Sequence, residues 1–298
     1  MRYLVTGGAG FIGSNLVDCL IDQGHEVSVI DNESSEAHES FYWNSKANNH
    51  KYDICNYNAI RHIFTDVDVV FHMAAESRIQ ASIYNPLHTM MVNTIGTCNI
   101  LQIAREAGIK RVVLSSTSAI YGANAPPLDE EMARDCLNPY STSKSASEDL
   151  CRMYTHLYDI ETVVLRYFNV YGPRQPIRGQ YAPVVGIFLR QKSEGKPMTI
   201  VGTGEQRRDF VHVSDVVGAN LLAADLQNKD IVGESFNIGT GINYSVSELA
   251  DMIGGEKSFI PPREGEIAVS LADNSKAKLL LSWKPQTCLK GWIKNENR

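Results

Sequence analysis

The chain is predicted to fold as an α/β protein, with a doubly wound parallel sheet and a smaller C-terminal α/β substrate-binding lobe. Two observations support this prediction. Short apolar runs alternate with helical patterns over the first 168 of the 298 residues, and glycine-rich or polar motifs follow the ends of those runs. Because such sheets bind ligands beyond the carboxyl ends of their strands, the motifs lie where a binding site is expected.

The first predicted element is a strand followed by a glycine turn and a helix. Residues 1–5 form a short, mainly apolar run, and helical spacing of apolar residues begins after the glycines. Gly7 permits a tight turn, Gly10 lets the backbone approach a pyrophosphate, and Gly13 allows the helix to pack on the strand. The unpaired N–H groups at the start of the helix would face the anion. The pattern predicts a Rossmann-type dinucleotide site.

A carboxylate ends the second predicted strand. Residues 26–30 form that strand, and Asp31 follows it. At about twenty residues beyond the glycines, a carboxylate accepts hydrogen bonds from the adenosine ribose of the dinucleotide. No arginine immediately follows Asp31 to neutralise a 2′-phosphate, which favours NAD over NADP.

The remaining elements continue the alternation. Strands are predicted at residues 67–75, 110–115 and 161–166, and helices at residues 93–107 and 139–158. We expect residues 1–168 to form the NAD-binding domain, with returning segments at about 205–240, and residues 169–298 to form mainly the substrate-binding lobe. No linker separates the two parts, so the cleft between them is the expected substrate site.

A tyrosine and a lysine lie four residues apart at the start of the long predicted helix. Tyr140 and Lys144 share one face of that helix, so we expect the ammonium to lower the pKa of the phenol. A tyrosine of lowered pKa is a general base at neutral pH. The cluster Ser115, Ser116 and Thr117 ends the preceding strand, and its hydroxyls could bridge substrate to the tyrosine or cap the following turn.

Composition and charge argue against several classes of protein. The net charge of −6 argues against nucleic acid as a partner. No apolar run reaches the roughly 18 residues of a transmembrane helix, so no membrane association is expected. The six cysteines are scattered and do not cluster with histidines, so we expect reduced thiols, no metal site and a cytoplasmic protein.

Arginines of the second half could give the cleft a positive charge that suits an anionic substrate. Each of them could instead be a solvated surface charge. The candidates are Arg166, Arg174, Arg178, Arg207, Arg208 and Arg263.

Ordered motifs along nearly the entire chain carry a resemblance to a known family. The chain resembles the extended short-chain dehydrogenases/reductases, and among them the nucleotide-sugar epimerases typified by UDP-glucose 4-epimerase. The matching motifs are Thr6-Gly-Gly-Ala-Gly-Phe-Ile-Gly13, Asp31-Asn32, Asp53-Ile54, His72-Met-Ala-Ala75, Ser115-Ser-Thr117, Tyr140-x-x-x-Lys144, Arg166-Tyr-Phe-Asn-Val-Tyr-Gly-Pro-Arg174, Arg208-Asp-Phe-Val-His-Val213 and Arg263-Glu-Gly-Glu266.

The resemblance implies an NAD site and a UDP-sugar site. The residues implied to hold NAD are Gly7, Gly10, Phe11, Ile12, Gly13, Asp31, Asn32, Asp53, Ile54, Ala74, Ala75, Ser115, Tyr140, Lys144 and Phe168, with Phe168 near the nicotinamide. The residues implied to hold the UDP-sugar are Glu76, Ser116, Thr117, Asn169, Arg208, Arg263 and Ser270.

The resemblance further implies the reaction of an NAD-dependent UDP-sugar 4-epimerase acting on UDP-glucose and UDP-galactose. Tyr140 would take the proton of the sugar 4-hydroxyl while hydride passes from C4 to NAD. Thr117 would bind the same oxygen, and Lys144 would favour the phenolate. The 4-keto sugar would turn over, and return of hydride to its opposite face would invert the carbon.

Alternative activities stay open at this point. 4,6-Dehydratases and decarboxylases of the family start with the same oxidation, but they use acidic residues near places that hold Ser118 and Ala119 here. Glu76 could supply such a carboxylate, or it could be ion-paired with Arg78. A non-catalytic NAD-binding module is the alternative from another class, although it would have no need for all three catalytic residues.

Substrate choice and assembly rest on the resemblance alone. Ser270 matches a pocket position where small side chains admit 2-acetamido sugars, which extends the expected substrates to UDP-N-acetylglucosamine and UDP-N-acetylgalactosamine. A uronic acid stays open, and inversion at C4, C2 or C5 is not separable from sequence. The family also implies a homodimer, in which helices 93–107 and 139–158 pack as a four-helix bundle.

Overall fold

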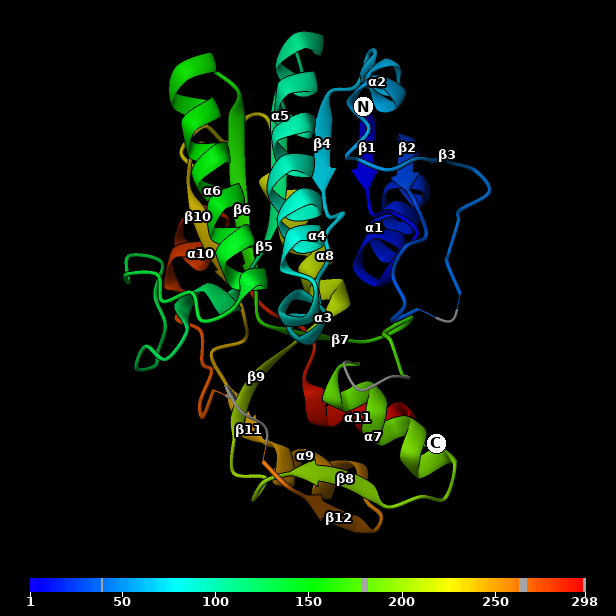
Figure 1. Ribbon diagram of the computed structural model, residues 1–298, viewed down its shortest axis with the longest axis vertical. Helices are drawn as coiled ribbons and strands as arrows, with labels where there is room; N and C mark the ends of the chain where they lie inside the picture. The colour runs from blue at the N-terminus through cyan, green and yellow to red at the C-terminus, as the bar shows by residue number, and fades with distance from the viewer. Residues whose placement is uncertain (39, 178–181, 263–266, 297–298) are drawn as a thin grey trace.

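The centre of the computed structural model is a parallel sheet of seven strands (Figure 1). The structure describes residues 1–38, 40–177, 182–262 and 267–296, and the strand count refers to these. The strand order is β10-β6-β5-β4-β1-β2-β3. The strands are β1 (Arg2–Thr6), β2 (Glu26–Asp31), β3 (Asn48–Lys51), β4 (Val69–His72), β5 (Arg111–Thr117), β6 (Glu161–Tyr167) and β10 (Ser235–Ile238). The order reverses between β1 and β4, which marks the expected ligand site.

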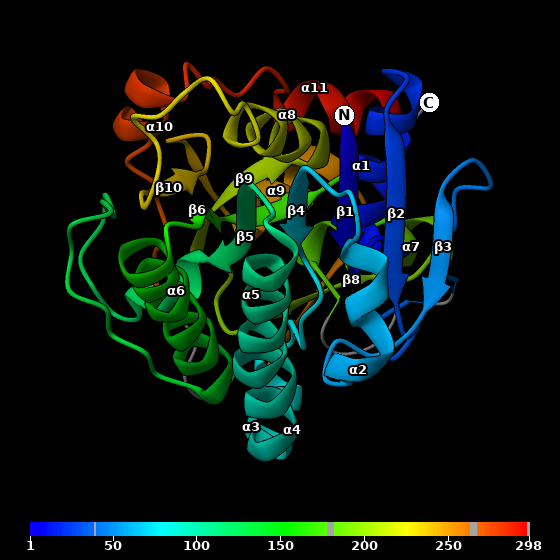
Figure 2. The same cartoon turned by 90° about the horizontal axis from the view of Figure 1, so that it is seen from above.

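Helices cover both faces of this sheet. Figure 2 shows α2, α5 and α6 on one side and α1 and α8 on the other. The π-helical segment η2 joins α4 to α5. The elements are α1 (Phe11–Asp22), α2 (Tyr57–Ile60), the 3-10 helix η1 (Arg61–Phe64), α3 (Ile79–Tyr84), α4 (Pro86–Met90), η2 (Met91–Ile95), α5 (Gly96–Ala107), the 3-10 helix η3 (Ser118–Tyr121), α6 (Pro139–Tyr158) and α8 (Val213–Ala223).

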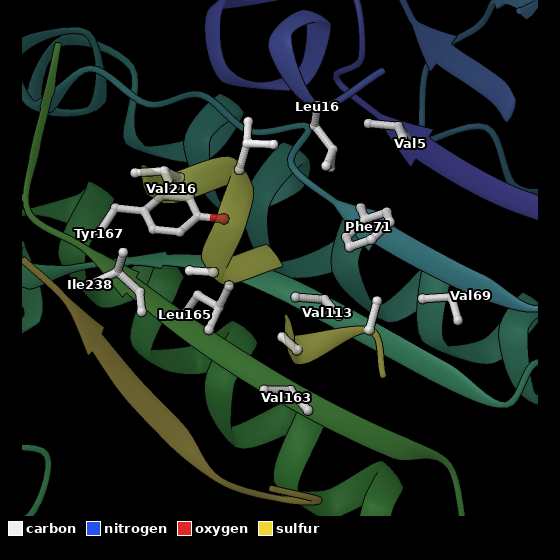
Figure 3. Close-up of a cluster of buried hydrophobic side chains, with 14 of the residues drawn as sticks. Val5, Leu16, Val69, Phe71, Val113, Val163, Leu165, Tyr167, Val216 and Ile238 are labelled. Atoms are coloured by element: carbon white, nitrogen blue, oxygen red, sulfur yellow. The ribbon is translucent and has the colours of Figure 1, made fainter. Parts of the chain in front are cut away.

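Apolar side chains fix the strands against the helices. On one face, Val5, Phe71 and Leu165 pack with Leu16 of α1 and Val216 of α8, and all five are fully buried (Figure 3). The opposite face packs in the same way against α5 and α6. Strands that are buried on both sides are rigid, so the loops at their carboxyl ends start from fixed positions.

The second half of the chain forms smaller sheets beyond those carboxyl ends (Figure 1). A three-stranded sheet has the order β11-β9-β7, and β12 pairs with β8. The elements are β7 (Asn169–Tyr171), α7 (Val184–Ser193), β8 (Met198–Val201), β9 (Arg207–His212), β11 (Asn243–Ser245), α9 (Val246–Ile253), β12 (Lys257–Ile260), α10 (Ser275–Leu280) and α11 (Leu289–Glu296). Among the described residues, no helix is both long and apolar enough to cross a membrane.

The predicted fold class is confirmed, and the differences are local. The helix predicted at 139–158 has those bounds, because Asn138 caps it and Pro139 occupies its first turn. The strand predicted at 67–75 covers only Val69–His72, since the chain leaves the sheet to line the site. The helix predicted at 93–107 is preceded by helical turns from Pro86 onward, with the π-helical segment in between.

Candidate active site

A cavity of about 340 Å³ lies beyond the carboxyl ends of β1 to β5. All of the predicted cofactor residues except Phe168 line it. These residues follow the ends of five different strands or lie at the starts of α1 and α6, so the sheet topology brings them together. The cavity therefore coincides with the dinucleotide site that the motifs predict.

The glycine turn at one end of the cavity has the geometry that an anion site requires. A Cβ on Gly13 would lie 2.2 Å from the carbonyl oxygen of Gly7, so α1 can approach the turn only without a side chain there. A Cβ on Gly10 would meet nothing closer than 3.4 Å, and it would occupy the cavity instead. No side chain caps the start of α1. Its N–H groups are therefore free to bind a pyrophosphate, and the turn fits NAD.

Asp31 is held in place at the end of β2. Its carboxylate accepts hydrogen bonds from the backbone N–H groups of Ala9 (3.1 Å) and Glu33 (2.8 Å). Burial raises the pKa of Asp31, although both hydrogen bonds oppose the increase. Each carboxylate oxygen can still accept a ribose hydroxyl. Asn32 donates to Asp53 at 3.1 Å and links the ends of β2 and β3.

One predicted cofactor residue is not among those that line the cavity, and two residues that were not predicted are. Phe168 is buried in a small apolar cluster with Ile120 and Tyr121, and the cavity is lined by its neighbour Tyr167 instead. His38 and Arg78 also line the cavity. His38 lies in the loop after β2 and Arg78 in the loop after β4. Position after a strand end is the only sequence signal for these two residues, because their loops carry no motif.

The residues predicted to be catalytic meet where β5 ends against α6. The side chain of Thr117 interacts with Tyr140 and opposes the rise of its pKa. The ammonium of Lys144 donates to the carbonyl of Ser115 at 2.8 Å, and both ends of this contact are buried. Tyr140 and Lys144 also line the cavity. The predicted proximity of the three residues is therefore present in the structure.

The charge state of this cluster differs from the expectation. The pKa of Tyr140 is raised, mainly by burial and further by the negative charge of Glu76, while the hydrogen bond to Thr117 opposes the increase. Burial lowers the pKa of Lys144 to about 8. The expected lowering of the Tyr140 pKa by Lys144 is not present in the protein without ligand: burial raises that pKa, and the Lys144 ammonium is bound to the carbonyl of Ser115.

Thr117 caps the following turn, which is one of the two roles considered for the hydroxyl cluster, and it also interacts with Tyr140. Its Oγ1 accepts a hydrogen bond from the N–H of Ala119 at 3.1 Å and so caps η3. The same hydroxyl contacts Tyr140. A hydroxyl has one proton and two lone pairs, so the two contacts are compatible.

Glu76 is ion-paired with Arg78. The Nε and Nη2 atoms of Arg78 lie 3.0 Å from the two carboxylate oxygens, and the backbone N–H of Arg78 adds a contact of 3.1 Å. Arg78 also reaches Glu36 at 3.3 Å. Of the two alternatives for Glu76, a carboxylate available to the sugar or an ion pair with Arg78, the structure shows the ion pair.

The structure brings three of the predicted substrate residues to β9 and its neighbours. Asn169 lies on β7, which pairs with β9, and its Nδ2 donates to the carbonyl of Asp209 at 3.1 Å. Arg208 is on β9 itself, and Ser270 lies in a segment beside it, where the N–H of Ser270 donates to the carbonyl of Arg207 at 3.0 Å. Arg263 lies outside the described residues.

Other arginines of the expected cleft take structural roles. Arg166 is 3% exposed and binds the carboxylate of Glu148 through two nitrogens, so it does not line a cleft. Arg207 binds Asn243. Arg174 is ion-paired with Asp18, while Arg178 lies outside the described residues.

A family model decides the identity of this fold and site. Residues 3–239 match the model described as the NAD dependent epimerase/dehydratase family. The chain belongs to this family. Its cofactor is NAD, and the glycine turn, Asp31 and the catalytic cluster are the parts of the chain that fit it.

Curated relatives span several activities on UDP-sugars. A putative UDP-glucose 4-epimerase of Methanocaldococcus jannaschii is 40% identical over 99% of this chain and 99% of its own length. A UDP-glucuronate 4-epimerase of Thermodesulfobacterium geofontis is 34% identical over 98% of this chain and 94% of its own. UDP-glucuronic acid decarboxylase 1 of Xenopus tropicalis is 35% identical over 95% of this chain and 68% of its own.

Solved structures share the entire fold. UDP-glucose 4-epimerase of Thermotoga maritima with UDP-glucose has a TM-score of 0.93 and 38% identity, and the match covers 100% of this chain and 97% of that one. UDP-N-acetylglucosamine 4-epimerase of Methanobrevibacter ruminantium, in complex with UDP-N-acetylmuramic acid, has a TM-score of 0.92 and 32% identity over 99% and 96% of the two chains. The protein is therefore an enzyme of a family whose members act on UDP-sugars.

Proposed function

We propose that the protein inverts C4 of a UDP-hexose, interconverting UDP-glucose and UDP-galactose. The observation that carries this proposal is the cluster at the end of β5, where Tyr140 bonds Thr117 and Lys144 lies one helical turn away beside the cavity. A 4-hydroxyl placed against Tyr140 and Thr117 would have a base and a second hydrogen-bond partner on one oxygen. Of the relatives named above, the most similar are a putative UDP-glucose 4-epimerase and a UDP-glucose 4-epimerase solved with UDP-glucose.

The residues divide the work as follows. Tyr140, as phenolate, takes the proton of the 4-hydroxyl and later returns a proton to the same oxygen. Thr117 holds that oxygen while the sugar is in its 4-keto form. NAD, when bound, accepts the hydrogen of C4 with its electron pair and gives it back. Burial alone opposes the phenolate, so the positive charges of Lys144 and of bound NAD are needed to lower the pKa of Tyr140 in the complex.

Two features favour epimerisation over dehydration or decarboxylation. Those reactions need a further acid or base after the oxidation at C4, and the two positions after Thr117 are Ser118 and Ala119. Glu76 is the remaining candidate, and its carboxylate is bound by Arg78. A non-catalytic role is disfavoured because such a module would not need all three residues in one place. Thr117 lies against Tyr140, and Lys144 is one helical turn from Tyr140.

A neutral hexose suits the site better than a hexuronate. The negative charge of Glu76 reaches Tyr140, where it raises the pKa of the phenol. A uronate carboxylate close to Glu76 would meet this negative charge, and Arg78, the nearest cation, is already paired with Glu76. Ser270 is small, so we include the 2-acetamido sugars among the substrates, with Asn169, Arg208 and Arg263 as the proposed grip on the diphosphate.

Product analysis tests the proposal directly. The protein is incubated with UDP-glucose, UDP-galactose, UDP-N-acetylglucosamine and UDP-glucuronate, and the products are identified by nuclear magnetic resonance. We expect the 4-epimer of the neutral sugars. A pentose product with release of carbon dioxide from UDP-glucuronate would instead identify a decarboxylase, and absence of turnover across the panel would favour the binding module.

The division of the chain follows from this function. We propose that residues 1–168, with returning segments at about 205–240, hold NAD, and that residues 169–298 mainly hold the UDP-sugar. Two contacts support the returning segments: β10 pairs with β6, and α8 packs against α1.

We also propose a homodimer. Tyr84 and Leu87 are 92% and 79% exposed, and Met91 and Ile95 continue the same helical stripe toward the exposed Leu157 of α6. An exposed apolar surface of this kind fits a four-helix bundle between two copies. Leu87→Asp should convert the dimer to a monomer in light scattering after size exclusion. Ile242→Asp, at an exposed apolar residue of the other lobe, should not, and a dimer in both variants would contradict the proposal.

A further inference from the structure

Two hydrogen bonds join the end of β5 to α6. The ammonium of Lys144 donates to the carbonyl of Ser115 at 2.8 Å, and the hydroxyl of Ser116 donates to Oε1 of Glu148 at 2.5 Å. Lys144 and Glu148 are one helical turn apart, and their partners are adjacent on the strand. The next strand residue is Thr117. The helix that carries Tyr140 is therefore tied to the strand that carries its partner hydroxyl at two successive points.

Glu148 is itself held rigidly. Arg166 binds both of its carboxylate oxygens, at 3.0 and 2.8 Å, and Arg134 adds a contact of 3.1 Å. Glu148 and Arg166 are 2% and 3% exposed. Arg166 is fixed in turn by the hydroxyl of Tyr121 at 2.8 Å. A buried carboxylate with this many charged partners has one position available to it.

Glu148 does not need its hydrogen bond to Ser116 in order to be held in place. The two arginines already satisfy both carboxylate oxygens, and Arg166 connects α6 to β6 without the serine. What the serine adds is a link to the strand residue immediately before Thr117. A displacement of about 1 Å in a reacting group lowers the rate of catalysis strongly, so a hydrogen bond that fixes the residue before Thr117 can affect the rate.

We propose that Glu148 is a positioning residue, which acts through the hydroxyl of Ser116 to hold Thr117 against Tyr140. Glu148 does not reach the substrate in this arrangement. The inference rests on the proposed function, because it assigns Thr117 and Tyr140 to one substrate oxygen.

Three variants test the link in the NAD-loaded enzyme. Ser116→Ala removes the hydrogen bond and leaves the ion pair of Glu148 intact, so kcat should fall by about 10- to 100-fold while NAD content stays the same. KM should also stay the same, whereas a direct contact of Ser116 with the UDP-sugar would raise KM. Ser116→Thr keeps a hydroxyl and should recover most of kcat. Ser145→Ala is the matched control, because Ser145 lies on the same helix and accepts from Arg134 at 2.9 Å without touching the strand. It should retain full turnover.

The result that would overturn the proposal is an unchanged kcat in Ser116→Ala, or an equal loss in Ser145→Ala. Crystal structures supply a readout that does not depend on turnover. In Ser116→Ala, the hydroxyls of Thr117 and Tyr140 should be separated beyond hydrogen-bond distance, and their continued contact would also contradict the proposal. If the unmodified enzyme acts on none of the UDP-sugars, the proposed function fails, while the crystal structures still decide whether Ser116 positions Thr117.

Discussion

The two proposed lobes differ in how their binding surfaces are built. In the proposed cofactor lobe, each contribution follows a strand of one parallel sheet: Gly7 follows β1, Asp31 ends β2 and Ala74 follows β4. In the proposed substrate lobe, Asn169 and Ser270 come from segments about a hundred residues apart in the chain, and they meet only through their contacts with β9.

This difference separates the consequences of mutation. A parallel sheet that is buried on both faces keeps its strand ends in place, so a cofactor residue acts mainly on NAD. The small sheet of the substrate lobe depends on single contacts, so a residue that never touches the sugar can still change its binding. The predictions below therefore separate effects on NAD content from effects on binding of the UDP-sugar. Variants that change both together would show that the two lobes are not independent.

The largest expected effect is on turnover, since Tyr140 is the proposed base and lines the cavity. Tyr140→Phe removes the base and should lower kcat by about a thousandfold or more. NAD content, measured by absorbance after denaturation, should remain that of the unmodified enzyme. Normal turnover would eliminate the proposed base, and loss of NAD would show that the hydroxyl acts mainly in holding the cofactor.

Lys144 should leave a pH signature in the stability of the NAD-free protein. Its pKa is about 8 in the fold against 10.5 in the unfolded chain, because burial disfavours the ammonium. The unfolded state therefore binds more protons between pH 8 and 10.5, and the contribution of Lys144 to stability rises with pH in that window, by about 3 kcal/mol. Relative to Lys144→Met, denaturant unfolding should show this rise. A pH-independent difference would contradict it.

Gly13→Ala tests the cofactor lobe by itself. The added carbon would lie 2.2 Å from the carbonyl oxygen of Gly7, and a backbone atom cannot rotate away. We expect loss of bound NAD and destabilisation by about 1–3 kcal/mol. Gly218→Ala, in α8 with no atom within 4 Å of the new carbon, is the control and should stabilise the protein by about 0.5–1 kcal/mol. Equal NAD content in both variants would argue against the tight turn.

Asp209→Asn tests the substrate lobe. The Oδ2 of this buried carboxylate accepts from the N–H groups of Gly241 (2.9 Å) and Ala272 (3.2 Å), and Oδ1 accepts from Thr240. In the asparagine variant, the NH₂ group would replace one of the two oxygens and would face backbone N–H donors that it cannot accept from. We expect the resulting repulsion to shift the segment that holds Ser270. KM for the UDP-sugar should rise about tenfold, which corresponds to about 1.4 kcal/mol, with NAD content unchanged. A rise in KM accompanied by NAD loss would remove the distinction between the lobes.

Prediction from sequence worked best where chemistry follows a strand end. The glycines, Asp31 and the pair Tyr140 and Lys144 line one cavity, as their order along the chain indicates. Phe168 was expected beside the nicotinamide, and it packs into an apolar cluster because the two residues flanking a strand end face different layers. Arg166 was a candidate for the cleft, but it is ion-paired with Glu148 of α6. An ion pair between a helix and a strand leaves no local pattern in the sequence, so it could not be predicted.

The sequence by itself determined the sheet, the dinucleotide turn and the helix that carries the tyrosine, because each depends on the spacing of residues within about thirty positions. The tertiary structure decided the pKa of Tyr140, the engagement of Glu76 by Arg78 and the link from Ser116 to Glu148. Burial and ion pairing are properties of side chains that meet across the fold. Their strength depends on how much water is excluded and on which charge lies opposite, and neither is written in the local order of residues.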